Sequence, residues 1–82
     1  MEAAVQKQID ALPRPTQETF HELVLDLKAH GPVQPGWPNY SKLGPDTYHC
    51  HLARKWEAVW THKTGSNTIE VTYVGSREGA PY

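Results

Sequence analysis

The sequence predicts an α+β fold in which an N-terminal helical hairpin packs on a three-stranded antiparallel sheet. Two patterns carry this prediction: apolar residues recur every three or four positions in the first 30 residues, and at every second position after residue 47. A connection rich in proline and glycine, residues 31–46, separates the two halves and is predicted to hold no regular element. With 82 residues, the chain has room for one domain, residues 1–82.

The first half predicts two helices joined by a short turn. Pro13 and Pro15 interrupt the first apolar stripe, and the Thr16 hydroxyl is suited to capping the second helix. Gly31 followed by Pro32 ends the second helix. Two helices linked this closely are expected to form an antiparallel hairpin. The apolar positions of the two stripes are Ala4, Val5, Ile9 and Leu12, then Phe20, Leu23, Val24 and Leu27.

The second half predicts a three-stranded meander, because its period changes to two. The first strand starts at residue 47, and two more are predicted at residues 56–61 and 68–74, with Gly75 ending the last one. Alternation along the first strand separates two sets of side chains. Those predicted to face the helices are Tyr48, Cys50 and Leu52, and those predicted to face away are Thr47, His49 and His51.

A domain of this size must build its core from a few large side chains. Trp56 and Trp60 share one strand face by their spacing and are predicted to fill the core. Trp37 and Tyr40 are expected to fix the glycine- and proline-rich connection. Cys50, on the predicted inner face, is interpreted as a buried and inert thiol.

Composition excludes a disulfide scaffold and a membrane-spanning protein. The single cysteine can form no internal disulfide, which is typical of the reducing cytoplasm, and the apolar runs are far shorter than the roughly 20 residues that span a bilayer. The formal net charge of −1 is atypical of proteins that coat nucleic acids broadly. Residues 1–30 hold three basic and five acidic side chains, whereas residues 31–82 hold five basic and four acidic ones.

The order of elements and four short segments resemble the RelE/ParE toxin superfamily, within it the RelE-like mRNA interferases of toxin–antitoxin systems. The segments are KLG (42–44), YHCHL (48–52), WEAVW (56–60) and YVGSREGAPY (73–82). The resemblance implies a cytoplasmic toxin that cleaves mRNA on the ribosome, represses translation, needs no cofactor and is neutralised by a cognate antitoxin protein. The same superfamily contains gyrase inhibitors, so a non-catalytic interaction module on this fold is the alternative.

The chain departs from that family at its start. Family members begin with an edge strand, whereas this chain starts directly in a helix. We therefore expect a sheet that lacks its first edge strand, either because the start codon is misplaced or because the protein is a reduced member. An exposed sheet edge invites pairing, so an antitoxin segment or a second copy of the chain is expected to cover it.

RNA cleavage by the 2′-hydroxyl needs a base, an acid and positive charge near the phosphate. His49 and His51 lie two residues apart on one strand, so they point to the same face about 7 Å apart. Glu57 on the neighbouring strand is suited to act as the base or to hold a histidine in its charged form. By the resemblance, His49 and His51 occupy positions where RelE-like enzymes have lysines, and Glu57 occupies a position where they have an arginine.

The remaining candidate residues bind RNA or stabilise charge. The resemblance implies that Arg77 clamps the phosphate and that Tyr82 stacks on a base or donates a proton. Basic side chains expected to contact the RNA backbone are Arg54, Lys55 and Lys63.

Each candidate also has a plainer interpretation. A His-x-His pair is often a polar strand surface, and it could supply two metal ligands, although the sequence offers no evident third. Glu57 is more often a solvated strand residue than a base. Arg77 could pair with Glu78 or Glu70 at the surface. The catalytic and the plainer interpretations differ in what they predict for the burial of these side chains and for the distances between them.

Overall fold

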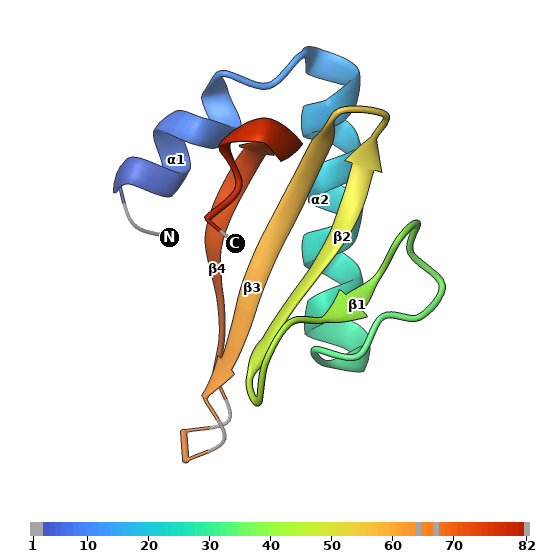
Figure 1. Cartoon of the computed structure of the whole chain (residues 1–82), viewed down its shortest axis with the longest axis vertical. Coiled ribbons are helices and arrows are strands. Elements are labelled where there is room, and N and C mark those ends of the chain that lie inside the picture. Colours follow the sequence, from blue (N-terminus) through green and yellow to red (C-terminus); the bar gives the residue numbers. More distant parts are fainter. Residues whose placement is uncertain (1–2, 64, 67, 82) are drawn as a thin grey trace.

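The computed structural model describes residues 3–63, 65–66 and 68–81, and its fold is α+β as predicted (Figure 1). Within these ranges, two helices precede a four-stranded sheet, and a short 3-10 helix follows it. The elements are α1 (Ala3–Asp10), α2 (Arg14–His30), β1 (Ser41–Lys42), β2 (Thr47–Ala53), β3 (Trp56–Lys63), β4 (Thr68–Ser76) and η1 (Arg77–Gly79). No described helix has the length and apolar character that a membrane crossing requires.

The strands follow one another in the order β1-β2-β3-β4, and each is antiparallel to its neighbour. Three of them form the predicted meander. The fourth, β1, lies in the connection that was predicted to hold no regular element. It has two residues, so it leaves no periodic signal, and it exists because Ser41 and Lys42 pair with His49 and Tyr48 of β2.

The helices differ from the predicted hairpin in detail. α2 runs along one face of the sheet behind β2 and β3, whereas α1 lies beside β4 (Figure 1). The larger contacts of α1 are with β4 and those of α2 are with β2, so each helix packs mainly on its own strand. α2 also begins at Arg14, with Pro13 at its N-cap and Pro15 in the first turn, where proline is well tolerated. Thr16 is therefore not the cap but a buried residue of the helix.

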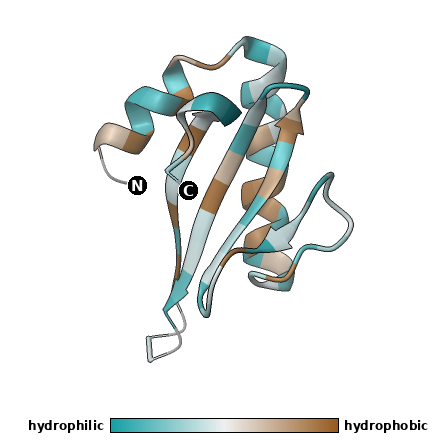
Figure 2. Cartoon of the chain, in the orientation of Figure 1, coloured by the Kyte–Doolittle hydropathy of each residue, from teal (hydrophilic) through white to brown (hydrophobic). Residues whose placement is uncertain are grey.

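The core lies between the helices and the inner face of the sheet, and apolar residues alternate along the strands there (Figure 2). Tyr48, Cys50 and Leu52 are buried as predicted. Trp60 is fully buried, and its indole N–H donates to the carbonyl oxygen of Pro32 at 3.1 Å. Trp56 is partly buried against the same core.

Two aromatic residues fix the 31–46 connection, as the sequence predicts. The Trp37 indole N–H donates to the Asp26 carboxylate of α2 at 2.8 Å. Tyr40 stacks on Tyr48 and on Trp60, with ring centroids 6.3 Å apart in both pairs. The connection therefore has a fixed position beside β2: Trp37 and Tyr40 pack against the core, while Asn39 and Ser41 reach the histidines of the outer face.

Candidate active site on the outer sheet face

The outer face of the sheet, the side away from α2, carries a row of polar side chains from three consecutive strands. Strand register places Ser41 of β1 opposite His49 of β2, and His51 of β2 opposite Glu57 of β3. Side chains on the same face of neighbouring strands lie close enough to interact, both directly opposite and diagonally. The row Ser41–His49–Glu57 is therefore built on backbone pairing rather than on loop positions.

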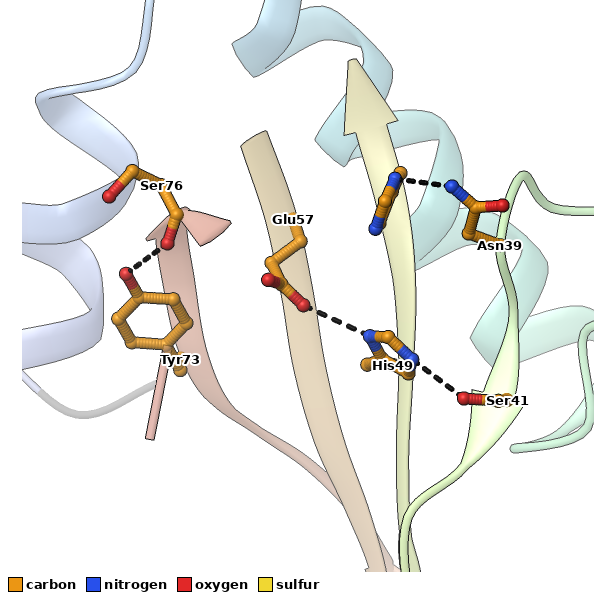
Figure 3. Close-up of polar contacts among 7 residues, drawn as sticks. Asn39, Ser41, His49, Glu57, Tyr73 and Ser76 are labelled. Carbon is orange, nitrogen blue, oxygen red and sulfur yellow. Dashed lines mark hydrogen bonds and ion pairs between the residues drawn. The ribbon is translucent and has the colours of Figure 1, made fainter. Parts of the chain in front are cut away.

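His49 has a hydrogen-bond partner on each ring nitrogen (Figure 3). Nδ1 lies 3.0 Å from Oε2 of Glu57, and Nε2 lies 2.6 Å from Oγ of Ser41. An ionised carboxylate can only accept, so Nδ1 carries the donated proton. In the neutral imidazole, Nε2 then holds the lone pair, which makes it the atom that can accept a proton.

Glu57 is buried, with a side chain only 1% exposed, while the His49 side chain is 12% exposed. The interpretation of Glu57 as a solvated strand residue is therefore wrong, because the residue reaches diagonally across the sheet to His49 and lies within the protein. A buried carboxylate needs a partner, and His49 provides one. Of the two roles predicted for Glu57, this geometry favours holding a histidine over acting directly as a base.

His51 is oriented by Asn39. The Nδ2 amide of Asn39 lies 2.7 Å from Nδ1 of His51, and because an amide nitrogen only donates, Nδ1 accepts. The proton of neutral His51 is then on Nε2. Asn39 has a φ of 51°, in the left-handed region that asparagine tolerates, and the His51 backbone N–H donates to Pro38 at 2.8 Å.

Burial lowers the pKa of His51, and the nearby positive charge of Arg77 lowers it further. Both effects disfavour the imidazolium. The His49 and His51 rings meet edge to face with their centroids 6.1 Å apart. The geometry therefore sets neutral His51, with an Nε2–H donor, next to His49, whose Nε2 can accept a proton when that ring is neutral.

Arg77 lines three neighbouring hollows at the end of the sheet where the β2–β3 turn meets η1. His51 lines two of them, with volumes of about 580 and 540 Å³, and we call these the Arg77 cleft. Lys55 lines the first and Arg54 the second. The backbone N–H of Arg77 donates to the Lys55 carbonyl at 2.9 Å, which fixes η1 to the turn. The structure thus brings together five predicted site residues, His51, Arg54, Lys55, Glu57 and Arg77, and Glu78 also lines the first hollow.

Among the remaining predicted residues, Lys63 belongs neither to this group nor to the row that contains His49. Lys63 lies at the opposite end of β3, six residues or roughly 20 Å along the strand from Glu57. Its ammonium lies 3.4 Å from the Glu70 carboxylate, so Glu70 pairs with Lys63 and not with Arg77. Tyr82 lies outside the described residues.

The sequence pattern predicts no role for Ser41 or Asn39. Both lie in the connection predicted to be irregular, and a two-residue strand has no period to detect. An asparagine at a positive φ and a serine opposite a histidine become visible only when strand pairing is known.

Tyr73 and Gly75 close the β4 side of this face. The Tyr73 hydroxyl donates to the carbonyl oxygen of Ser76 at 2.8 Å (Figure 3). A Cβ at position 75 would lie 2.7 Å from that hydroxyl oxygen, which explains the glycine opposite Glu57. β4 continues through Gly75 to Ser76, so the prediction that Gly75 ends the strand is wrong.

Among the described residues, no group of three histidine, cysteine, aspartate or glutamate side chains is arranged to hold a metal ion. His49 and His51 instead have protein partners on Nδ1. Comparison of the chain with protein-family models, with curated proteins and with solved structures found no match. The fold and this face define a class of site: an oriented imidazole–carboxylate pair next to a cleft lined by three cations, Arg54, Lys55 and Arg77, and by two carboxylates, Glu57 and Glu78.

Proposed function

We propose that this protein is a toxin-type endoribonuclease, which cleaves mRNA through attack of the RNA 2′-hydroxyl on the adjacent phosphate and so represses translation. The observation that carries the proposal is the position of His51. It contacts His49 edge to face and also lines the Arg77 cleft, so a proton acceptor and a group of cations lie on either side of one residue.

In this proposal, His49 is the base. Glu57 holds the proton on Nδ1, so Nε2 can take the proton of an incoming 2′-hydroxyl once that hydroxyl replaces Ser41 at the ring. An oriented histidine of this kind typically contributes about 10²–10⁴-fold to a proton-transfer step. Glu57 then acts through His49 and needs no access to the substrate.

The phosphate occupies the Arg77 cleft. Guanidinium groups bind phosphate through paired hydrogen bonds. The charge of Arg77 also reaches His51, because it lowers the pKa of that ring. The Nε2–H of neutral His51 donates a further hydrogen bond to the phosphate or to the leaving 5′-oxygen. Arg54 and Lys55 extend the basic surface along the RNA backbone.

The proposed partners follow from the resemblance and from the sheet edges. A cognate antitoxin neutralises the toxin in the cytoplasm, and an extended antitoxin segment or a second copy of the chain pairs with the edge strand β4. One backbone donor of this edge, the N–H of Val74, is bonded to the Gln8 side chain at 3.0 Å, so pairing is expected along the 68–73 part of β4.

The test is cleavage of a defined RNA by the purified chain, alone and with translating ribosomes. We expect products with 2′,3′-cyclic phosphate ends. Arg77→Ala should lower the rate by at least about 100-fold, because it removes charge stabilisation of the transition state. Lys63→Ala is the matched control, since it removes a cation at the far end of the same sheet, and it should cleave like the parent.

Two outcomes contradict the proposal. One is RNA that stays intact under both conditions while the protein binds gyrase or another protein tightly, which would assign a non-catalytic interaction module. The other is equal loss of activity in Arg77→Ala and Lys63→Ala, which would mean that general charge, not the cleft, drives cleavage. Growth arrest on expression, relieved by the cognate antitoxin, tests the toxin assignment separately.

A further inference from the structure

Ser41 is the exposed end of a hydrogen-bonded chain that runs through His49 to Glu57 (Figure 3). Its Oγ lies 2.6 Å from Nε2 of His49, and Nδ1 of the same ring lies 3.0 Å from Glu57. Hydroxyl to Nε2 and carboxylate to Nδ1 is the connectivity that activates a serine nucleophile in unrelated folds. We propose that Ser41 is a nucleophile of this kind, which accepts acyl groups from small activated carboxylic esters.

The exposure of the three residues runs in the order that this chemistry needs. Glu57 is 1% exposed and His49 is 12% exposed, whereas Ser41 is an exposed residue of the edge strand β1. The Glu57 carboxylate is thus shielded from water, the His49 base is partly covered, and the Ser41 nucleophile is accessible to a substrate. Ser41 and His49 are also direct partners in strand register, which holds the hydroxyl and the ring together through the backbone.

The other serines of the chain have different partners. The hydroxyl of Ser66 donates to the carbonyl oxygen of Lys63, and the hydroxyl oxygen of Ser76 accepts the backbone N–H of Gly79. Ser41, Ser66 and Ser76 are all the serines in the sequence. The chain therefore offers two internal comparisons for the reactivity of Ser41.

The reaction is a balanced acyl transfer. Oγ of Ser41 bonds to the ester carbonyl carbon while Nε2 of His49 takes the hydroxyl proton, and the resulting tetrahedral adduct breaks its bond to the leaving alcohol, which departs with that proton. Water then attacks the acyl-serine through the same base, releasing the carboxylic acid and restoring the Ser41 hydroxyl. Glu57 stays ionised and stabilises the imidazolium formed in each half.

This inference shares His49 with the proposed ribonuclease but does not rest on it. It needs neither RNA nor the Arg77 cleft. The two activities differ in the hydroxyl that Nε2 of His49 deprotonates, which is the protein's own serine in one and the RNA 2′-hydroxyl in the other. If RNA cleavage is absent, acylation of Ser41 can therefore still be measured, and the reverse also holds.

The experiment treats the full chain with p-nitrophenyl acetate at about pH 8, where histidine side chains are ordinarily neutral. Rapid mixing measures the phenolate burst, and peptide mapping by mass spectrometry locates the acetyl group. A fluorophosphonate probe, which forms an Oγ–P bond and releases fluoride, provides a second map. We expect both labels on Ser41, with a rate about 100-fold above that of Ser66 or Ser76.

Three variants complete the test. Ser41→Ala should lose the label, and Ser66→Ala should keep it. Glu57→Gln keeps the side-chain shape but can donate to Nδ1, which moves the ring proton to Nε2 and should slow acylation by about 100-fold. If circular dichroism shows that Glu57→Gln is unfolded, the peptide maps of the labels and the two serine variants test the proposal without it. Equal labelling of the three serines, or an unchanged label yield in Ser41→Ala, overturns the inference.

Discussion

The Glu57 carboxylate lies 3.0 Å from Nδ1 of His49, and its side chain is almost fully buried, although it belongs to the sheet face that points away from the helices. This contact links stability to chemistry. The same hydrogen bond that satisfies a buried charge also fixes which nitrogen of His49 carries a proton. A change at either residue should therefore appear in both unfolding and activity measurements.

Replacing His49 is expected to destabilise the protein. His49→Ala deprives the buried Glu57 carboxylate of its imidazole partner, and the loss of a hydrogen bond to a charged group costs about 2–3 kcal/mol in the free energy of unfolding. Urea denaturation followed by tryptophan fluorescence measures this change. The double variant His49→Ala, Glu57→Leu should recover part of the loss, because it removes the charge as well.

Ser41→Ala is the control for this prediction. Ser41 is exposed, so its hydroxyl can be removed without leaving a buried group unpaired, and the unfolding free energy should stay within about 0.5 kcal/mol of the parent. A His49→Ala variant as stable as the parent would contradict the structural role of the pair.

Acid should destabilise the protein through His51. Its pKa is lowered in the folded state, first by burial and then by the charge of Arg77. The unfolded chain therefore binds a proton more readily, so stability is retained above the ordinary histidine pKa of about 6.5 and is lost as the pH falls toward the folded-state value. His51→Gln should flatten this dependence between about pH 7 and 5.

The titration of the His51 ring can be followed directly by NMR. Arg77→Ala should raise its pKa, because the guanidinium is the second cause of the shift, whereas Lys63→Ala should leave it unchanged. An unaltered His51 titration in Arg77→Ala would show that the Arg77 charge does not act on the ring, and would weaken the case for a shared cleft.

The sequence predicted the α+β class, the meander and the inner face of β2, because these depend on periodicity. Alternation at residues 47–52 places His49 and His51 outside, and the structure confirms this. The spacing of two residues along one strand requires no knowledge of long-range contacts. The outward orientation of His49 and His51 could therefore be predicted from the sequence alone.

What the sequence did not predict depends on pairing between distant segments. The strand β1 forms only because Ser41 meets His49, and Asn39 reaches His51 across a separation of 12 residues. The burial of Glu57 likewise follows from its diagonal contact with His49. The reading of Glu57 as solvated failed because local hydropathy carries no information about which neighbour a charged residue will meet.

Cys50 should be unreactive in the folded protein. Burial raises the pKa of its thiol to about 12, and the negative charge of Glu57 adds to the shift. Because the thiolate is the reactive species, Ellman's reagent at about pH 8 should react slowly with the native chain and rapidly in denaturing urea. Rapid reaction with the native chain would mean that the inner face of β2 opens frequently.

Gly75 and Tyr73 are expected to be energetically coupled. A Cβ at position 75 would lie 2.7 Å from the Tyr73 hydroxyl oxygen, so Gly75→Ala forces the ring to move and to give up its hydrogen bond to Ser76. The expected cost is about 1 kcal/mol in the free energy of unfolding. Gly44→Ala is the matched control, because a Cβ at position 44 meets no atom within 4 Å.

A double-mutant cycle tests the cause of that cost. In Tyr73→Phe, the clashing hydroxyl and its hydrogen bond to Ser76 are already absent, so adding Gly75→Ala should cost less than it does in the parent. The ring carbon that bears the hydroxyl would still lie 3.0 Å from the new Cβ, so some of the penalty should remain. Equal costs in the two backgrounds would show that the hydroxyl does not cause the penalty, and would place it in the β4 backbone instead.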